Sequence, residues 1–230
     1  MALTIRENVF GVNHPETATS YTNIALVYHA QGDYNAALEW HQKALAIREN
    51  VYGKEHPDTA SIYNNIAAVY RQHGEYDVAL EWYQKALAIR ETVLGTDHPY
   101  TAYVYNNIAE VYHDQRDYDK ALEWHQKALV ILEKALGKEH PNTAISYSNI
   151  ARDYYEKGVY DKALEWYQKA SVIFAKVFGA NHPLTLNSYR YITVIYYEQG
   201  DLDKAMEWFL KVEQFDQPYL YLGSADPIPE

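Results

Sequence analysis

Residues 53–70 read GKEHPDTASIYNNIAAVY, and 42 residues later residues 95–112 read GTDHPYTAYVYNNIAEVY. The His-Pro pair within this stretch recurs along the chain at the same step of 42 residues. Its five copies begin at His14, His56, His98, His140 and His182. A fixed period of roughly 20 to 50 residues is typical of solenoids, in which each unit buries apolar surface against the next. The chain is therefore predicted to be an array of one repeated unit.

Each unit contains two stretches with the apolar spacing of a helix. In residues 142–158, small and apolar side chains recur at three- and four-residue steps, and residues 160–179 repeat the pattern. A tight turn is expected between the two helices, because glycine accepts a left-handed backbone there at least cost. The turn glycines are Gly32, Gly74, Gly158 and Gly200. Arg116 fills the same place in the remaining unit, where a positive φ would leave it mildly strained.

The second helix of each unit carries a spaced pattern of small and aromatic residues. In one unit the pattern consists of Ala79, Trp82, Tyr83 and Ala86. These residues resemble the tetratricopeptide repeat, whose usual unit has about 34 residues. The longer unit, the GxxHPxTA connector and the ALxIRExxLG helix end resemble the kinesin light chain subtype of that family. The resemblance implies an all-α fold, a right-handed superhelical solenoid of antiparallel helix pairs.

The repeat pattern divides the chain into five units and two ends. The predicted units are 12–53, 54–95, 96–137, 138–179 and 180–216. Residues 2–11 align with residues 44–53, so residues 1–11 are interpreted as the second half of a truncated repeat, which suggests a piece of a longer array. Pro218 cannot continue a helix. Residues 217–230 show no helical period and are predicted to form a non-repeat tail.

Composition limits the classes of partner. The formal net charge of −11 argues against a binder of nucleic acid or anionic membrane, because phosphate surfaces attract clustered Lys and Arg. The chain has no cysteine, which excludes disulfides, thiolate nucleophiles and cysteine-containing zinc sites. No stretch approaches the roughly 18 consecutive apolar residues of a membrane span. These features predict a cytoplasmic protein with protein or peptide partners, and no nucleic acid or membrane partner.

Neither the histidines nor any motif indicates a reactive centre. The connector histidines come one per unit, on the order of 20 Å apart, because each unit stacks two helices of about 10 Å diameter. They cannot share a metal ion and are expected to bond the backbone where the next helix starts. His41 and His125 occupy the slot of Tyr83 and Tyr167, which predicts packing residues with one polar edge. Because no HExxH, GxxxxGK[ST] or GxSxG motif occurs, no catalytic, metal or cofactor site is predicted.

The candidate site is the concave side of the superhelix, which the first helix of each unit lines. One position on that side is asparagine in four successive units. This asparagine ladder consists of Asn23, Asn65, Asn107 and Asn149, and Tyr191 ends it. A carboxamide both donates and accepts hydrogen bonds, so the ladder could bind the backbone of an extended peptide, and the family resemblance implies the same role. The alternative is that the asparagines bond to the neighbouring repeat or to water.

Basic and aromatic residues accompany the ladder on the predicted concave side. Three arginines face Glu110 alone, namely Arg71, Arg152 and Arg190. Large apolar anchors are predicted at Tyr103, Ile145, Tyr155 and Val194, and Tyr191 lies in the same lining. Aromatic anchors of this kind carry much of the energy of an interface. The predicted ligand is an extended or short helical peptide in which acidic residues flank large apolar ones.

Two other roles remain open at this point. The truncated first repeat leaves an apolar face that could stack against another chain, so the array could be a structural module that assembles end to end. The tail contains Tyr219, Leu220, Tyr221 and Leu222, followed by acidic groups. It therefore resembles the predicted ligand and could occupy a groove of its own chain or of a neighbour.

Overall fold

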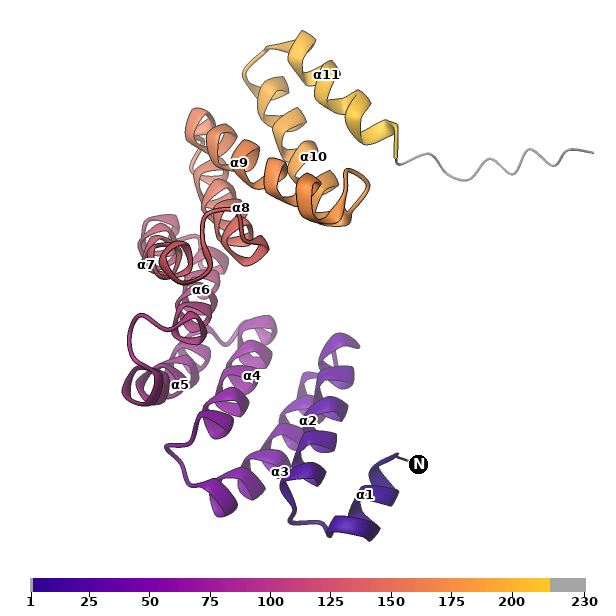
Figure 1. The fold of residues 1–230 in the computed structure, drawn as a ribbon, viewed down its shortest axis with the longest axis vertical. Coiled ribbons are helices and arrows are strands. Elements are labelled where there is room, and N and C mark those ends of the chain that lie inside the picture. The colour runs from indigo at the N-terminus through magenta and orange to yellow at the C-terminus, as the bar shows by residue number, and fades with distance from the viewer. Residues whose placement is uncertain (1, 216–230) are drawn as a thin grey trace, which may run out of the picture.

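The computed structural model describes residues 2–215, and within this range the chain forms eleven α-helices and no β-strand (Figure 1). They are α1 (Ala2–Phe10), α2 (Pro15–Ala30), α3 (Tyr34–Tyr52), α4 (Pro57–His73), α5 (Tyr76–Leu94), α6 (Pro99–Asp114), α7 (Tyr118–Leu136), α8 (Pro141–Glu156), α9 (Tyr160–Phe178), α10 (Pro183–Glu198) and α11 (Leu202–Glu213). The predicted all-α class is confirmed. The predicted tail, 217–230, lies outside the described residues.

The helices pack in pairs that stack into a curved solenoid. The most extensive contacts join α2 to α3, α4 to α5, α6 to α7, α8 to α9 and α10 to α11, and each pair also contacts the next. The single helix α1 packs on α2. In Figure 1, α5 and α7 lie on the outer edge of the arc, whereas α4, α6 and α8 lie on its inner side. First helices therefore line the concave surface.

The connector between units is a hydrogen-bonded turn that closes within itself. Gly53 has a φ of +88°, which ends α3, and Pro57 is the first residue of α4. The backbone N–H of Asp58 donates to Nδ1 of His56 at 3.1 Å, and Oγ1 of Thr59 donates to the carbonyl of Gly53 at 2.8 Å. The other four connectors repeat both bonds. The expectation that connector histidines bond the backbone is confirmed.

The turn within the third full unit differs from the others. Arg116 has a φ of +62°, and it is the only residue of the described range, glycines excepted, with a positive φ. Its N–H donates to the carbonyl of His113 at 2.8 Å, as the turn requires. The left-handed backbone predicted for Arg116 is confirmed.

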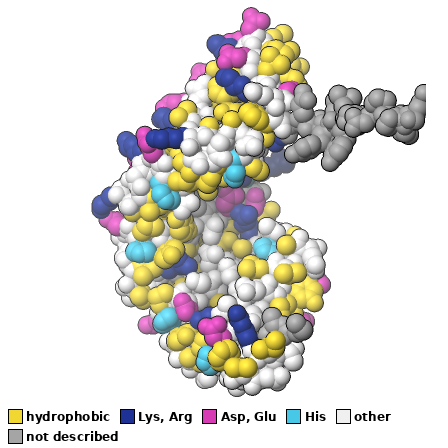
Figure 2. Space-filling model, turned by 45° about the vertical axis from the view of Figure 1, so that its right-hand side comes forward, with side chains coloured by type: hydrophobic (Ala, Val, Ile, Leu, Met, Phe, Trp, Pro, Cys, Tyr) yellow, Lys and Arg dark blue, Asp and Glu magenta, His cyan; other side chains and the backbone are white. Residues whose placement is uncertain are grey.

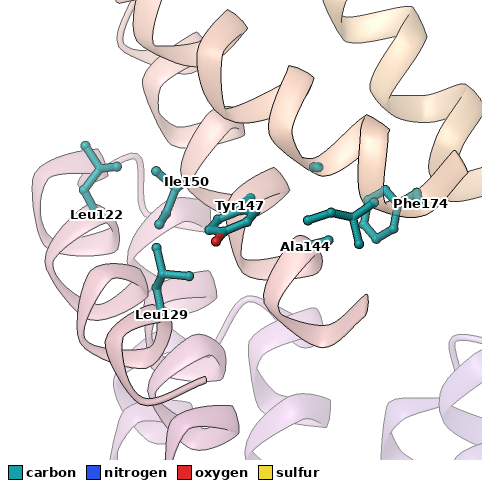
Figure 3. Close-up of a cluster of buried hydrophobic side chains, with 8 residues drawn as sticks. Leu122, Leu129, Ala144, Tyr147, Ile150 and Phe174 are labelled. Carbon is teal, nitrogen blue, oxygen red and sulfur yellow. The ribbon is translucent and has the colours of Figure 1, made fainter. Parts of the chain in front are cut away.

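The core lies between units as well as within them. One buried cluster joins Leu122 and Leu129 of α7 to Tyr147 and Ile150 of α8 and to Phe174 of α9 (Figure 3). Alanines at the helix crossings are fully buried, which lets the backbones approach closely. Because each unit completes its core with side chains of the next, the curvature of the array is held by apolar packing.

Candidate functional site

The concave surface contains a pocket of about 480 Å³ where three first helices meet. Its lining comes from α4, α6 and α8, with one residue of α5. The lining residues are Ala68, Arg71, Tyr83, Tyr103, Asn106, Asn107, Glu110, Asn142, Ile145 and Asn149. Figure 2 shows acidic and basic side chains close together in the recess between the upper and lower parts of the molecule. The pocket brings together four predicted site residues, namely Arg71, Tyr103, Asn107 and Asn149.

The asparagine ladder is divided among different surroundings. Asn23 is exposed, and Asn65 lines a smaller pocket of about 150 Å³ between α2, α3 and α4. Asn107 donates from Nδ2 to Oδ1 of Asn64 in the preceding unit at 2.8 Å. Among residues 2–215, no side-chain hydrogen bond holds Asn23, Asn65 or Asn149. The bond to a neighbouring repeat, one of the two expected alternatives, thus describes Asn107 alone.

The two arginines nearest the pocket are already paired with one carboxylate. Nη1 of Arg71 donates to Oε2 of Glu110 at 3.1 Å, and Nη2 of Arg152 donates to Oε1 of the same residue at 2.5 Å. Asp114, whose carboxylate lies 3.5 Å from Nε of Arg71, adds a second negative charge. The groove is therefore closer to neutral here than the sequence predicted, because Glu110 does not stand alone.

The ionised form of Glu110 is strongly favoured. Burial alone would raise its pKa, but the hydrogen bond from His125 and the charges of Arg152, His125 and Arg71 outweigh burial. Together they hold the pKa of Glu110 well below its usual range. Glu110 is thus a fixed negative charge in the wall of the pocket.

Polar contacts also tie Tyr103 to the next unit. Nδ2 of Asn142 donates to the hydroxyl of Tyr103 at 2.6 Å, and Nδ2 of Asn106 donates to Oγ of Ser146 at 3.2 Å. The carbonyl oxygen of Asn106 is buried without a hydrogen-bond partner. Sequence reasoning missed Asn106 and Asn142, although the Asn-Asn pair in YNNIA could have indicated Asn106. Both residues bring amide groups into the pocket wall.

The remaining predicted site residues lie farther along the array. The ring of Tyr191 stacks on Tyr167, with centroids 4.7 Å apart, and meets Tyr155 edge to face at 5.7 Å. Tyr155 and Tyr191 are half-buried, whereas Arg190 is exposed on α10. The structure does not bring these three residues to the pocket between α4, α6 and α8. They form a separate aromatic surface with a neighbouring cation.

A buried charged cluster lies behind the pocket wall. His125 and Asp153 have fully buried side chains, and Nδ1 of His125 lies 2.7 Å from Oδ2 of Asp153. Nδ1 of His113 lies 2.6 Å from the other oxygen, Oδ1, of Asp153. The prediction that His125 is a packing residue with one polar edge holds for its burial but omitted its charged partners. Sequence reasoning missed Asp153, although valine occupies the matching positions 69 and 111.

Two kinds of feature are absent from the described range. Residues 2–215 contain no helix that combines the length and the hydropathy needed to cross a membrane. Within these same residues, histidine and acidic side chains form no group of three or more that could hold a metal ion.

Comparison with known families and structures follows the repeat. The tetratricopeptide repeat model matches residues 1–50, 18–92, 58–134, 100–171 and 146–217. The chain belongs to the tetratricopeptide repeat family. Tetratricopeptide repeats are generally non-enzymatic scaffolds, and stacked repeats of this kind present extended concave surfaces to other proteins. The family thus indicates protein–protein interaction in general. No curated protein matches the sequence.

Several solved structures share the tetratricopeptide solenoid. The kinesin light chain nearly identical TPR-like repeats of Podosopora anserina are 26% identical, with a TM-score of 0.71, over 88% of this chain and 96% of theirs. BtubC (BKLC) from P. vanneervenii is 20% identical, with a TM-score of 0.78, over 100% of this chain and 90% of its own. Aspartyl phosphate phosphatase F from Bacillus subtilis is 19% identical, with a TM-score of 0.74, over 85% and 49% respectively. The last two show the fold alone, and the kinesin light chain-like subtype is confirmed.

Proposed function

We propose that this tetratricopeptide array is an interaction scaffold that binds an extended or short helical peptide in the pocket between α4, α6 and α8. The observation that carries the proposal is the lining of that pocket, in which carboxamides and a guanidinium surround apolar surface. Ala68, Tyr83 and Ile145 supply the apolar part. A pocket that combines apolar area with a few polar groups is the usual form of a recognition site.

Asn149 is the ladder residue best placed to hold peptide backbone. It lines the pocket, and within residues 2–215 its carboxamide makes no hydrogen bond. A carboxamide can accept from a peptide N–H and donate to a peptide carbonyl at once, whatever the side chains of the ligand. Asn107 is less available, because it already donates to Asn64.

The charges of the pocket favour a ligand with acidic residues. Arg71 and Arg152 each donate to Glu110, but a guanidinium has five N–H donors in a planar fork. Donors that Glu110 does not use can bind a carboxylate of the ligand. Because two guanidiniums share one carboxylate, an acidic side chain would complete the pairing, while an apolar neighbour fills the space beside Ile145.

The test uses peptides selected from a phage-displayed random library against the intact chain. Asn149→Ala should weaken the selected peptides by about 1–3 kcal/mol in calorimetric titration, because hydrogen bonds to the ligand are lost. Asn23→Ala is the matched control, since Asn23 occupies the same slot outside the pocket and should leave the affinity unchanged. Equal affinity for the chain and for Asn149→Ala would contradict the proposal.

End-to-end assembly is a second candidate, favoured by the exposed C-terminal face. An apolar pocket of about 520 Å³ lies between α10 and α11, and Phe209 is 44% exposed there. Tyr83 and Tyr167, which occupy the same slot in earlier units, are each 1% exposed because the next unit covers them. A second copy of the chain could cover Phe209 in the same way. Light scattering across concentration tests the idea: a dimer that Phe209→Glu abolishes supports it, and a monomer at every concentration contradicts it.

The remaining sequence-based expectations stay proposals. Binding of the tail 217–230 in a groove concerns residues outside the described range. If the tail competes for the groove, its deletion should raise the affinity for the selected peptides. A cytoplasmic location, and partners other than nucleic acid or membrane, rest on the acidic, cysteine-free composition.

A further inference from the structure

Glu110 connects the buried cluster to the groove. Its Oε1 accepts from Arg152 and lies 3.6 Å from Nε2 of His125, while its Oε2 accepts from Arg71. His125 is fully buried behind the wall, whereas the two arginines are partly exposed at the groove. Three cationic groups therefore share one carboxylate, two from the groove side and one from the interior.

The geometry around His125 matches a protonated ring. Its Nδ1 faces Asp153 at 2.7 Å and its Nε2 faces Glu110 at 3.6 Å, so a carboxylate lies opposite each nitrogen. Only the imidazolium carries an N–H on both nitrogens. Burial opposes the charge, but the hydrogen bonds to both carboxylates and their charges raise the pKa of His125 above its ordinary value.

Packing does not explain why this cluster is present. The residues that match Asp153 in the other units are Val27, Val69, Val111 and Ile195. An apolar residue therefore suits this position four times out of five. Buried ion pairs are often no more stable than apolar residues of similar volume, because both charges lose their hydration. The cluster is thus better explained by what it does to Glu110 than by stability.

We infer that His125 and Asp153 are positioning residues of the groove, which hold Glu110 and thereby set how much of the positive charge of Arg71 and Arg152 an acidic ligand meets. Protonated His125 offsets part of the charge of Glu110, which leaves the arginines freer to bind a carboxylate. When His125 loses its proton, Glu110 is balanced by the arginines alone. Affinity for acidic ligands is then lower at alkaline pH.

Other charged groups around His125 contribute to the same balance. The groups that face it or its partners are Glu110 and His113 from α6, Arg152 and Asp153 from α8, Arg71 from α4, Asp114 beside Arg71, and Tyr167 of α9 beside Arg152. Among these, His113 also titrates with a histidine side chain. It bonds to Asp153 and has no bond to Glu110, so its protonation reaches the groove only indirectly.

The inference rests on the proposed function, and its first test requires no ligand. Nuclear magnetic resonance of the ring protons of His125 in the intact chain, followed from pH 5 to 10, should show a midpoint above the ordinary value of about 6.5. Glu110→Gln should lower that midpoint, because it removes one of the two facing carboxylates. A midpoint below 6.5, or no response to Glu110→Gln, would overturn the inference even if peptides bind.

The second test measures binding with two defined probes. A fluorescein-labelled peptide of alternating Glu and Leu, and the same peptide with Gln for Glu, are titrated by fluorescence polarisation from pH 6 to 9. The affinity of the intact chain for the Glu probe should fall at least threefold across this range, and that for the Gln probe should stay level. A level profile for the Glu probe, at measurable affinity, would overturn the inference.

Variants separate positioning from a merely structural role. His125→Tyr with Asp153→Val installs residue types that other units carry at these positions, so the chain should fold and the pH profile should flatten. His113→Gln should keep the slope, and loss of the slope in that variant alone would overturn the assignment to His125. If neither probe binds at any pH, the proposed function fails for acidic peptides, while the resonance titration still decides whether His125 holds Glu110.

Discussion

His41 and His125 occupy the same position of the repeat, two units apart, and both side chains are fully buried. Neither nitrogen of His41 has a hydrogen-bond partner, and burial together with the charge of His29 lowers its pKa to about 4. His125 instead faces two carboxylates, which raise its pKa. One histidine is therefore neutral and the other positively charged at neutral pH, in matching places of one fold.

The difference arises from two substitutions on neighbouring helices. In the repeat register, the residues that correspond to Glu110 and Asp153 near His41 are Leu26 and Val69. A buried histidine among apolar groups stays neutral, whereas one between carboxylates takes a proton. The comparison shows that the charge of a repeat position is decided by the units on either side, and not by the residue at that position.

The largest effect is expected when the charged cluster loses one member. Asp153→Val should lower the free energy of unfolding by about 3–5 kcal/mol, because His125 is left buried without its closest counter-charge. Urea unfolding followed by circular dichroism measures the change. The double variant His125→Tyr with Asp153→Val should recover most of the loss. A loss below about 1 kcal/mol for Asp153→Val would mean that the cluster is not an ion pair.

The two histidines should give stability profiles of opposite sign. The unfolded chain protonates near pH 6.5 but folded His41 only near pH 4, so acidification over that interval should lower stability by up to about 1.4 kcal/mol per pH unit. For His125 the folded pKa is raised, so its contribution is complete below the unfolded pKa and is lost as pH rises through the folded pKa.

Thermal unfolding between pH 4 and 10 separates these contributions. His41→Phe should remove the part of the acid slope that belongs to His41, and the double variant at 125 and 153 should remove the part of the alkaline slope that belongs to His125. Both slopes contain terms from other groups, so each variant is compared with the unaltered chain. An acid slope unchanged in His41→Phe would show that His41 is not held neutral.

A smaller gain is expected from replacing His41 at neutral pH. His41→Phe should raise the free energy of unfolding by about 1 kcal/mol, because two buried nitrogens without partners are removed. Phe209 shows that the repeat accepts this residue type at the position. His125→Phe is the matched comparison and should destabilise the chain, since it leaves Asp153 buried with His113 alone. The same sign for both variants would remove the contrast between the two sites.

The smallest effect concerns the turn that precedes α7, on which His125 lies. Arg116→Gly should stabilise the chain by about 0.5–1 kcal/mol, because its φ of +62° suits glycine better than arginine. The reverse change at the matching turn, Gly158→Arg, should destabilise by a similar amount. Chemical denaturation measures both. No gain for Arg116→Gly would indicate that side-chain contacts of Arg116 offset the strain.

The fold follows from the sequence because its determinants are local. The His56 cap, Pro57 and the bond from Thr59 to Gly53 all lie within seven residues, and the spacing of Tyr147 and Ile150 marks a helix face directly. Any unit repeats these signals, so five copies reinforce one prediction. Even the strained backbone at Arg116 can be predicted, since its neighbours in the repeat are glycines.

The site is less predictable because its contacts join different units. The bond from Asn107 to Asn64 depends on the rotation between successive pairs, which no spacing within a unit reveals. The pairing of Arg71 and Arg152 with Glu110 depends on three first helices meeting at one point. Asp153 is visible in the sequence as a departure from valine, but its contact with His125 requires the packing of α8 on α7.

The closed connector has a consequence for how such a chain can change in length. All the connector bonds around His56 and Thr59 begin and end between Gly53 and Thr59, so a cut made just after one connector and before the next removes whole units and orphans no polar group. Duplication or loss of 42 residues would rejoin equivalent backbone to equivalent backbone. Gene rearrangement could thus lengthen or shorten the array in whole steps, while individual units acquire singular residues such as Asp153.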